Sequence, residues 1–504
     1  MTRTLLTIFF TMMLCLPAMT QNISRRGPGC WRTKTAQSVA SARLSGARNS
    51  IKPHYRGQKK GLVILAEFAD TKFNEGNDRQ KFNDILNTPG YTSSEGFKGS
   101  VADYFRDQSG GLFELQFDVV GPFTTKHNYA YYGQNDEYDN DLHPDEMIVE
   151  MCRAADDVVN FADYDWDGNH IADEVFVVYA GKGEADNENS PNYIWPHMWT
   201  LREAGKTLIL DKTIINVYAC ANELMADNHI NGIGTFCHEF SHCLGFPDFY
   251  DISYSGLYGM GDLDLMASGV YANNGFCPVG FSAFEKMSCG WQEPIVLGNE
   301  DVIVDNIKPM SQQGDFYIMY NDANANEYYL IENRQRDGWD KYMPTKGLMI
   351  SHVDFDQEVW DNNIPNTIVS ENEARAQGYT CGNDHQRMTV FFATNNNNIP
   401  SFYPYLRNDS LTATSRPAAI LYNQNSQDMK LMTGSILDIH KNSDGTMGFR
   451  YRAVNPIITA VQSPTATRRP SNAVYTLDGR LVTPSAKPLH KGIYIVEGKK
   501  YVVQ

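Results

Sequence analysis

Runs of apolar residues and regular polar alternation divide the first half of this chain into expected strands and helices. The sequence GLVILAEFAD, residues 61–70, is almost continuously apolar and predicts a buried strand. FELQFDVV, residues 113–120, alternates apolar and polar positions as a strand does, and VFVVYA, residues 175–180, predicts a third strand. Helical spacing is found in residues 101–109, which two glycines follow, and in residues 144–160. Strands that alternate with helices predict an α/β arrangement here.

Beyond residue 294 the pattern changes to short apolar runs. DFYIMY at 315–320, EYYLIE at 327–332 and GLMISHV at 347–353 are separated by turns rich in asparagine, aspartate and glycine. Short strands with frequent turns predict a mostly-β, sandwich-like domain over residues 295–453.

Both ends of the chain differ in composition from its middle. Residues 1–20 have the basic start, the apolar centre and the small residues that are typical of an export signal, with cleavage expected before Gln21. The apolar centre is too short to span a membrane. We therefore expect six segments: a signal peptide at 1–20, a polar pro-segment at 21–57, a first folded domain at 58–294, the β-rich domain at 295–453, a linker at 454–471 and a short C-terminal β module at 472–504.

Composition and charge narrow the class of protein. The chain has 504 residues, of which 42% are hydrophobic, and this length predicts about two or three domains. Acidic residues outnumber basic ones by 60 to 43, for a net charge of −17. Nucleic acid is not an expected partner, because binding phosphate needs a basic surface. The nine cysteines are scattered, without the paired spacing of a thiolate zinc site.

The clearest chemical signal is TFCHEFSHCLGFPDFYD, residues 235–251. Its apolar positions recur at helical spacing, so His238 and His242 lie one turn apart on one face and both imidazoles reach one metal ion. Glu239 lies beside them, placed to take a proton from a metal-bound water. The glycine after the helix predicts a chain reversal that brings in Asp248 as a third ligand. The pattern HExxHxxGxxD therefore predicts a catalytic zinc site.

Two alternatives to this assignment remain open. The segment is an ordinary core helix if both histidines are satisfied by neighbours inside the protein. The third ligand is Glu223, which precedes the helix in the sequence ANEL, if Asp248 points elsewhere.

The motif also resembles that of the metzincin clan of zinc peptidases, whose last ligand is usually histidine and sometimes aspartate. The wider pattern, over residues 61–452, is similar to the immune inhibitor A family of secreted bacterial metallopeptidases. The stretches that carry this resemblance are GSVADYFRDQSGG, HEFSHCLGFPDFYD, DLMASG, GFSAFEKMSCGW, EYYLIENRQ and GLMISHVD. The resemblance implies an α+β catalytic domain over residues 58–294, with a central mixed sheet and an active-site helix.

The same resemblance implies a role for the segment LDLMASGVY, residues 263–271. It is similar to the clan's Met-turn, which places Met266 as an apolar base beneath the metal. From the residues alone, Met266 is a core side chain. Tyr271 and Tyr250 are candidates for supporting a tetrahedral oxyanion, and the alternative for each is a buried core tyrosine.

The sequence DYDWDGNHIADE, residues 163–174, fits the twelve-residue template of a calcium loop. A strand follows it and His170 replaces the usual aliphatic residue, so we expect a structural calcium site rather than a helix–loop–helix sensor. A solvated acidic turn is the alternative. The candidate ligands are Asp163, Asp165, Asp167, Asn169, Asp173 and Glu174.

Two features near the ends of the chain suggest regulation and sorting. Cys30 lies in the expected pro-segment, where its thiolate is a candidate for blocking zinc's fourth position in a precursor. An ordinary free or disulfide-bonded cysteine is the alternative. The C-terminal module at 472–504 resembles the end of the sorting domains of type IX secretion, although it is shorter, and a small appended hairpin is the alternative.

These observations lead to one preferred function and one alternative. We expect a secreted zinc endopeptidase that acts on proteins or peptides, with Glu239 as general base. If secretion machinery recognises the C-terminal module, we also expect attachment to the cell surface. The alternative is an inactive surface adhesin or binding protein on a peptidase-like fold. Retention of Glu239 favours the enzyme, because metal binding alone does not require a base.

Overall fold

The computed structural model of this chain describes residues 55–137, 140–185 and 190–453, together with the backbone of four strands between residues 474 and 503. The chain divides into two compact units, residues 1–454 and 455–504. Cys30, the signal peptide and most of the pro-segment and linker lie outside the described residues.

The first half of the larger unit is built on a five-stranded sheet with the order β2-β1-β3-β7-β4. Four strands run parallel, and the edge strand β4 is antiparallel to β7, so the sheet is mixed, as expected. The strands expected at residues 61–70, 113–120 and 175–180 are found as β1, β2 and β3, with shifted ends. The strands are β1 (Gly57–Glu67), β2 (Phe113–Thr124), β3 (Phe176–Lys182), β4 (His197–Thr200) and β7 (Val217–Leu224), with a separate hairpin of β5 (Leu208–Leu210) and β6 (Thr213–Ile215).

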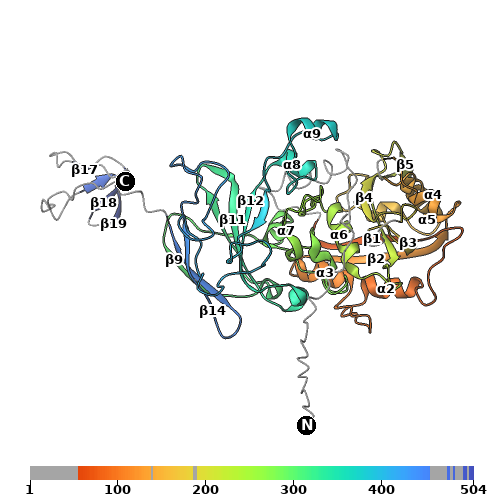
Figure 1. Cartoon of the computed structure of the whole chain (residues 1–504), viewed down its shortest axis with the longest axis horizontal. Helices are drawn as coiled ribbons and strands as arrows, with labels where there is room; N and C mark the ends of the chain where they lie inside the picture. The colour runs from red at the N-terminus through yellow and green to blue at the C-terminus, as the bar shows by residue number, and fades with distance from the viewer. Residues whose placement is uncertain are drawn as a thin grey trace, which may run out of the picture. The chain divides into compact units, whose positions relative to one another are not determined.

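Helices connect and cover these strands (Figure 1). Helix α3 begins after Ser100, which forms a capping box with Asp103. Helix α5 ends at Ala155 and not at residue 160 as expected; a turn follows, and Asn160, whose side chain accepts the N–H of Ala162, caps the separate 3₁₀ helix η3. The helices are α2 (Arg79–Asn87), α3 (Val101–Gln108), α4 (Tyr129–Gly133), α5 (Pro144–Ala155), α6 (Ile233–Cys243) and α7 (Ala283–Ser288), with 3₁₀ turns η3 (Phe161–Tyr164), η4 (Gly261–Leu263) and η5 (Ser268–Tyr271).

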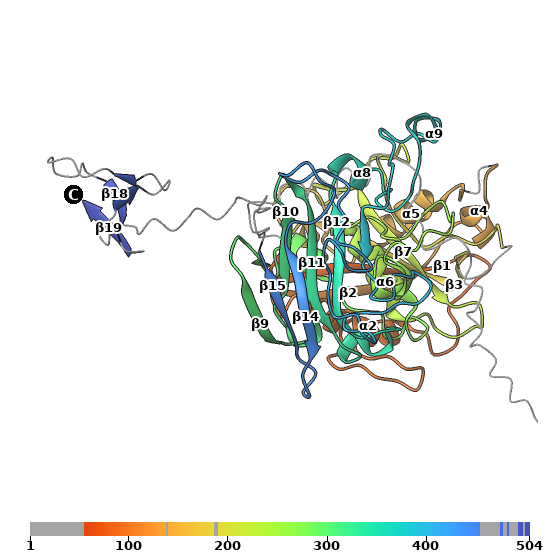
Figure 2. The ribbon, with the colours of Figure 1, turned by 60° about the vertical axis from the view of Figure 1, so that its left-hand side comes forward.

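The second half of this unit is β-rich, as expected, and consists of two sheets. The first has the order β13-β12-β11-β10-β8 and the second the order β14-β15-β9. The two sheets share one buried apolar core, and Figure 2 shows them as adjacent layers. The elements are β8 (Ile295–Val296), β9 (Val302–Ile307), β10 (Tyr317–Asn321), β11 (Asn324–Arg334), β12 (Gly347–Asp354), β13 (Met388–Val390), β14 (Ser435–Lys441) and β15 (Met447–Arg452), with α8 (Gln357–Asp361), α9 (Glu371–Ala376), η6 (Met310–Gln312) and η7 (Gly338–Tyr342).

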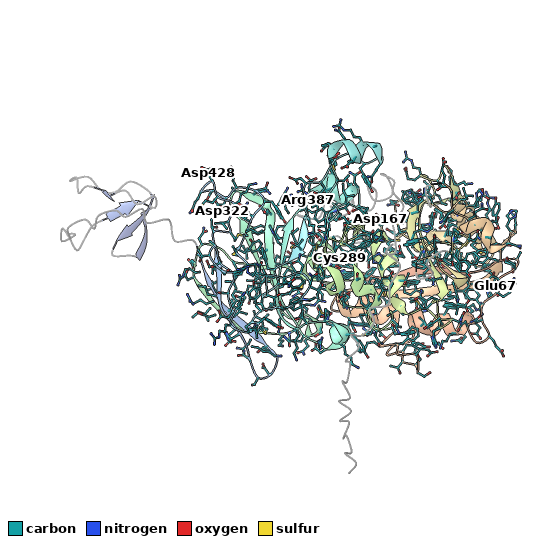
Figure 3. The ribbon with its side chains drawn as sticks, viewed as in Figure 1. Glu67, Asp167, Cys289, Asp322, Arg387 and Asp428 are labelled. Carbon is teal, nitrogen blue, oxygen red and sulfur yellow. The ribbon has the colours of Figure 1, made fainter. Side chains whose placement is uncertain are left out.

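Buried polar contacts join the β-rich half to the first half. The guanidinium of Arg334 on β11 donates two hydrogen bonds to Asp340, at 2.8 and 2.7 Å, and one to the carbonyl of Gly280 at 2.9 Å. A carboxylate oxygen of Glu332 accepts the N–H of Ala283 at the start of α7, at 2.8 Å. The boundary that we expected near residue 294 therefore lies inside one packed unit. Figure 3 shows Cys289 between Glu67 at one side of this unit and Asp322 at the other.

The smaller unit is an antiparallel sheet with the order β17-β16-β18-β19. Its strands are β16 (Val474–Thr476), β17 (Leu481–Val482), β18 (Gly492–Val496) and β19 (Lys499–Val503), so the expected terminal hairpin is part of a slightly larger sheet. In the described part of the chain, no helix combines the length and apolar character needed to cross a bilayer. None of the seven cysteines described there forms a disulfide, and six of them are buried.

Candidate metal centre

Helix α6 carries the site and packs one face tightly against the sheet. The ring of Phe236 stacks on that of Phe176 with a centroid distance of 3.8 Å, and Phe240 packs against Phe105. Its first turn lies so close to the following segment that a methyl group added at Gly234 would fall 2.1 Å from the carbonyl oxygen of Val270. This packing fixes the helix and directs the histidine face toward the segments that follow.

Helix α6 ends in a chain reversal at Gly245, as expected from the sequence. Gly245 has a φ of +104°, and its N–H bonds the carbonyl of His242, while the N–H of Phe246 bonds that of Ser241. These two bonds form a Schellman motif, which reverses the chain direction. The reversal also brings the carbonyl of Phe246 back to the imidazole of His242, whose Nδ1 donates to it at 2.7 Å.

The two imidazoles are held in one tautomer. His238 Nδ1 donates to the carbonyl of Leu265 at 2.8 Å, as His242 Nδ1 does to Phe246. Since a carbonyl oxygen only accepts, each Nδ1 carries the proton and each Nε2 presents a lone pair. The two Nε2 atoms face each other at 3.1 Å. Backbone carbonyls that fix the tautomer in this way are typical partners of metal-binding histidines.

Asp248 completes the group. Its Oδ1 lies 3.2 Å from His238 Nε2 and 3.4 Å from His242 Nε2, and all three side chains are fully buried. Oδ1 has no hydrogen-bond donor among the described residues.

These three ligand atoms fit a divalent cation. Two lone pairs and a carboxylate oxygen meet without a proton between them, an arrangement that is costly in a buried site unless a cation is shared. Three ligands at about 2.1 Å from a tetrahedral zinc ion would be about 3.4 Å apart, close to the three separations found here. The alternative of two core histidines satisfied by neighbours does not account for the convergence of Asp248.

Glu239 lies beside the ligands without joining them. It is fully buried, and neither carboxylate oxygen has a hydrogen-bond partner among the described residues that meets ordinary geometry. Burial raises the pKa of Glu239 to about 8; the charge of Asp248 acts in the same direction and His238 opposes it. A buried carboxyl group with a strongly shifted pKa next to a ligand cluster is typical of a general base.

The segment expected to form the Met-turn lies against the ligands. The carbonyl of Leu265 holds His238, and the carbonyl of Met266 accepts the N–H of Phe249, next to Asp248, at 2.7 Å. Met266 is fully buried. Of the two tyrosine candidates, Tyr250 lies two residues after Asp248 and Tyr271 ends η5. Burial raises the pKa of Tyr250, and the charge of Asp248 acts in the same direction.

Glu223 does not lie with the histidines. Its carboxylate accepts the N–H of Asn74 at 2.7 Å, the amide of Asn77 at 2.7 Å and the N–H of Gly181 at 2.9 Å. It therefore fixes the loop before α2 to the ends of β3 and β7, and it is absent from the ligand group that the described residues form.

The acidic loop brings together only part of its expected calcium ligands. Carboxylate oxygens of Asp165, Asp167 and Asp173 lie within 4.8 Å of one another. Asp165 also accepts the N–H groups of the turn, and Asp163 pairs with Lys60 at 3.1 Å. The amide oxygen of Asn169 bonds the N–H of Ile171, and Glu174 is 1% exposed. The calcium site stays a prediction.

One residue at the site was not found from the sequence. Asn363, which lies 115 positions after Asp248, donates from Nδ2 to Asp248 Oδ2 at 2.7 Å. No spacing rule connects residues so far apart, and asparagine has no signal of its own as a partner of a metal ligand.

Comparison with known proteins agrees with this geometry. Residues 54–292 match the model of the catalytic domain of immune inhibitor A peptidase M6. The pre-pro-metalloprotease PrtV of Vibrio cholerae serotype O1 is 29% identical over 275 residues, which is 46% of this chain and 30% of that relative. Immune inhibitor A of Bacillus thuringiensis subsp. alesti is 26% identical over 278 residues, 45% of this chain and 39% of that relative. The matches thus span well under half of each relative's length. The chain contains a catalytic domain of the immune inhibitor A (M6) peptidase family.

Proposed function

We propose that the chain is an exported zinc-dependent endopeptidase that hydrolyses peptide bonds of proteins. The observation that carries the proposal is the convergence of His238, His242 and Asp248 beside the buried carboxyl group of Glu239. Membership of a metallopeptidase family supports a metal at this site, and two imidazoles with one carboxylate are a ligand set that suits zinc. The export signal expected at residues 1–20 supports export.

Each residue has a definite part in the proposed reaction. His238, His242 and Asp248 would hold the zinc ion, which when bound supplies a Lewis acid that makes water a nucleophile near neutral pH and polarises the peptide carbonyl. Glu239 accepts the proton of the attacking water and then returns it to the leaving amine. Its burial keeps bulk water from competing for that proton. Tyr271 and Tyr250 are proposed to support the oxyanion, and Met266 to form the apolar base of the site.

The test separates catalysis from metal binding. In Glu239→Gln we expect casein cleavage by the chain collected from culture medium to fall by about 10²- to 10⁴-fold, because general acid–base catalysis contributes on that order. Zinc content per chain should stay at the wild-type value. Glu75→Gln, at an exposed loop residue, is the matched control.

The same experiment distinguishes the proposed enzyme from the alternative, an inactive binding protein. If the wild-type chain binds zinc but no chelator-sensitive cleavage is found in any processed form, the chain is a binding protein. Cleavage that persists in Glu239→Gln would rule out the proposed mechanism.

A further inference from the structure

The third ligand is held by a residue of the β-rich half, outside the matched catalytic domain. Asn363 Nδ2 donates to Asp248 Oδ2 at 2.7 Å, and the backbone N–H of Asp248 donates to Asn363 Oδ1 at 2.6 Å. One amide group thus contacts both the side chain and the backbone of the same residue. These two contacts fix the rotation of the carboxylate, so that Oδ2 is engaged and Oδ1 faces the two imidazoles.

Local geometry explains why an asparagine is present at this position. Asn363 follows α8, with its N–H bonded to the carbonyl of Trp360 at 3.1 Å, and the N–H of Ile364 bonds that of Val359 at 3.2 Å. This is again a Schellman motif, whose residue after the cap adopts a left-handed conformation, and Asn363 has a φ of +58°. Glycine is the usual residue there and asparagine the common substitute. The asparagine keeps the turn and adds an amide that glycine lacks.

Neighbouring residues hold this turn against residues 248–252, the segment that begins with Asp248. Asn366 donates to the carbonyl of Phe249 at 2.8 Å and to that of Met388 on β13 at 2.7 Å. Thr367 Oγ1 accepts the N–H of Ile252 at 2.9 Å. The segment from residue 363 to 367 therefore runs along residues 248–252, and the sheet behind it fixes its position.

We propose that Asn363 is a positioning residue for the zinc site, and that the β-rich half thereby completes the catalytic centre. This inference rests on the proposed function, because it assumes that Asp248 is a zinc ligand. A hydrogen bond to the outer oxygen of a ligating carboxylate orients it before the metal arrives and lowers the entropy lost on binding.

Asn363→Gly tests the proposal, because glycine satisfies the left-handed backbone and removes only the amide. We expect the zinc dissociation constant of the full chain, measured by competition with a chelator, to rise by about 10- to 100-fold. The metal-free form should remain folded, with a modestly lower unfolding midpoint, because the buried N–H and carboxylate of Asp248 lose their partners. The visible absorption of the cobalt(II)-substituted chain should shift, since it reports on ligand geometry. Asn395→Gly, at an exposed asparagine with a φ of +53°, is the matched control.

Asn363→Asp provides a second variant should Asn363→Gly unfold. Aspartate also tolerates the left-handed conformation, but its carboxylate faces Asp248 in place of the donating amide, so the same loss of zinc affinity is expected. Zinc affinity within twofold of wild type in a folded variant, while Asp248→Ala loses binding, would overturn the proposal and leave the proposed function intact. A wild-type chain that binds no zinc would overturn both.

Discussion

Glu239 is subject to two opposing electrostatic influences. Burial raises the pKa of its carboxyl group to about 8, so the metal-free protein favours the protonated form at neutral pH. A divalent cation held by His238, His242 and Asp248 would favour the carboxylate instead. The base is therefore expected to become charged when the site is loaded, which couples metal binding to the state that catalysis needs.

This coupling predicts the direction of the pH dependence. A carboxyl group acts as a base only after losing its proton, so kcat/KM should rise with pH and have its limb on the acid side, with an apparent pKa below about 8 in the zinc-loaded chain. The measurement is the rate of peptide cleavage against pH, with bound zinc determined at each point. A rate that falls as pH rises over this range, at constant zinc content, would exclude Glu239 as the base.

Residues of this site differ in how far the sequence alone predicts them. His238, Glu239, His242 and Asp248 occur within eleven positions, and helix periodicity followed by a glycine turn determines their placement. Asn363 was not predicted, because its contact depends on how two halves of the chain pack. The calcium loop has the right residue types, but its carboxylates also serve the N–H groups of their own turn, and a sequence template does not show that competition.

At the scale of elements, the fit of α6 against residues 270–275, which follow the expected Met-turn residue Met266, determines where the histidines point. Gly234 and Gly232 allow the first turn of the helix to lie against the backbone at Val270 and Gly275. Glycine inside a helix costs about 1 kcal/mol relative to alanine, so its presence in the first turn indicates a steric requirement.

Gly234→Ala is therefore expected to destabilise the protein despite the better helix propensity of alanine. The added methyl group would lie 2.1 Å from a backbone oxygen that cannot rotate away, and overpacking of this kind costs about 1–3 kcal/mol, more than the propensity gain. A lower midpoint of urea unfolding and weaker zinc binding should follow together. Gly298→Ala is the control, since no atom lies within 4 Å of its added methyl group. Equal or higher stability of Gly234→Ala would contradict the steric argument.

Element positions were predicted more reliably than element ends or contacts. The buried strands β1 and β3 were found because strands covered on both faces are continuously apolar. The end of α5 was missed, because apolar periodicity does not record the local turn that follows Ala155.

At the scale of the whole molecule, the family match ends before the fold does. The match covers residues 54–292, whereas the buried core of the same unit includes Trp339 and Trp360 from the β-rich half. Lys286 on α7 is 2% exposed and lies close to Glu332 and Arg334. The first half therefore has polar and apolar surfaces that only the second half covers.

A chain that ends at residue 292 is accordingly expected to lose its fold. Removing a buried tryptophan costs about 3–5 kcal/mol, and leaving a buried charge without its partner costs a similar amount. The loss of two tryptophans and one charge partner therefore amounts to about 9–15 kcal/mol, comparable to the total stability of about 5–15 kcal/mol that is typical of a domain. A chain that ends at residue 453 keeps these contacts, as well as Asn363 beside Asp248, and is the matched control. Circular dichroism and zinc titration should show a folded, zinc-binding protein only for the longer chain. If the chain that ends at residue 292 folds and binds zinc with full affinity, the β-rich half is an accessory domain and not part of the catalytic unit. In that case neither the buried network around Arg334 nor the amide of Asn363 is needed to hold the ligands.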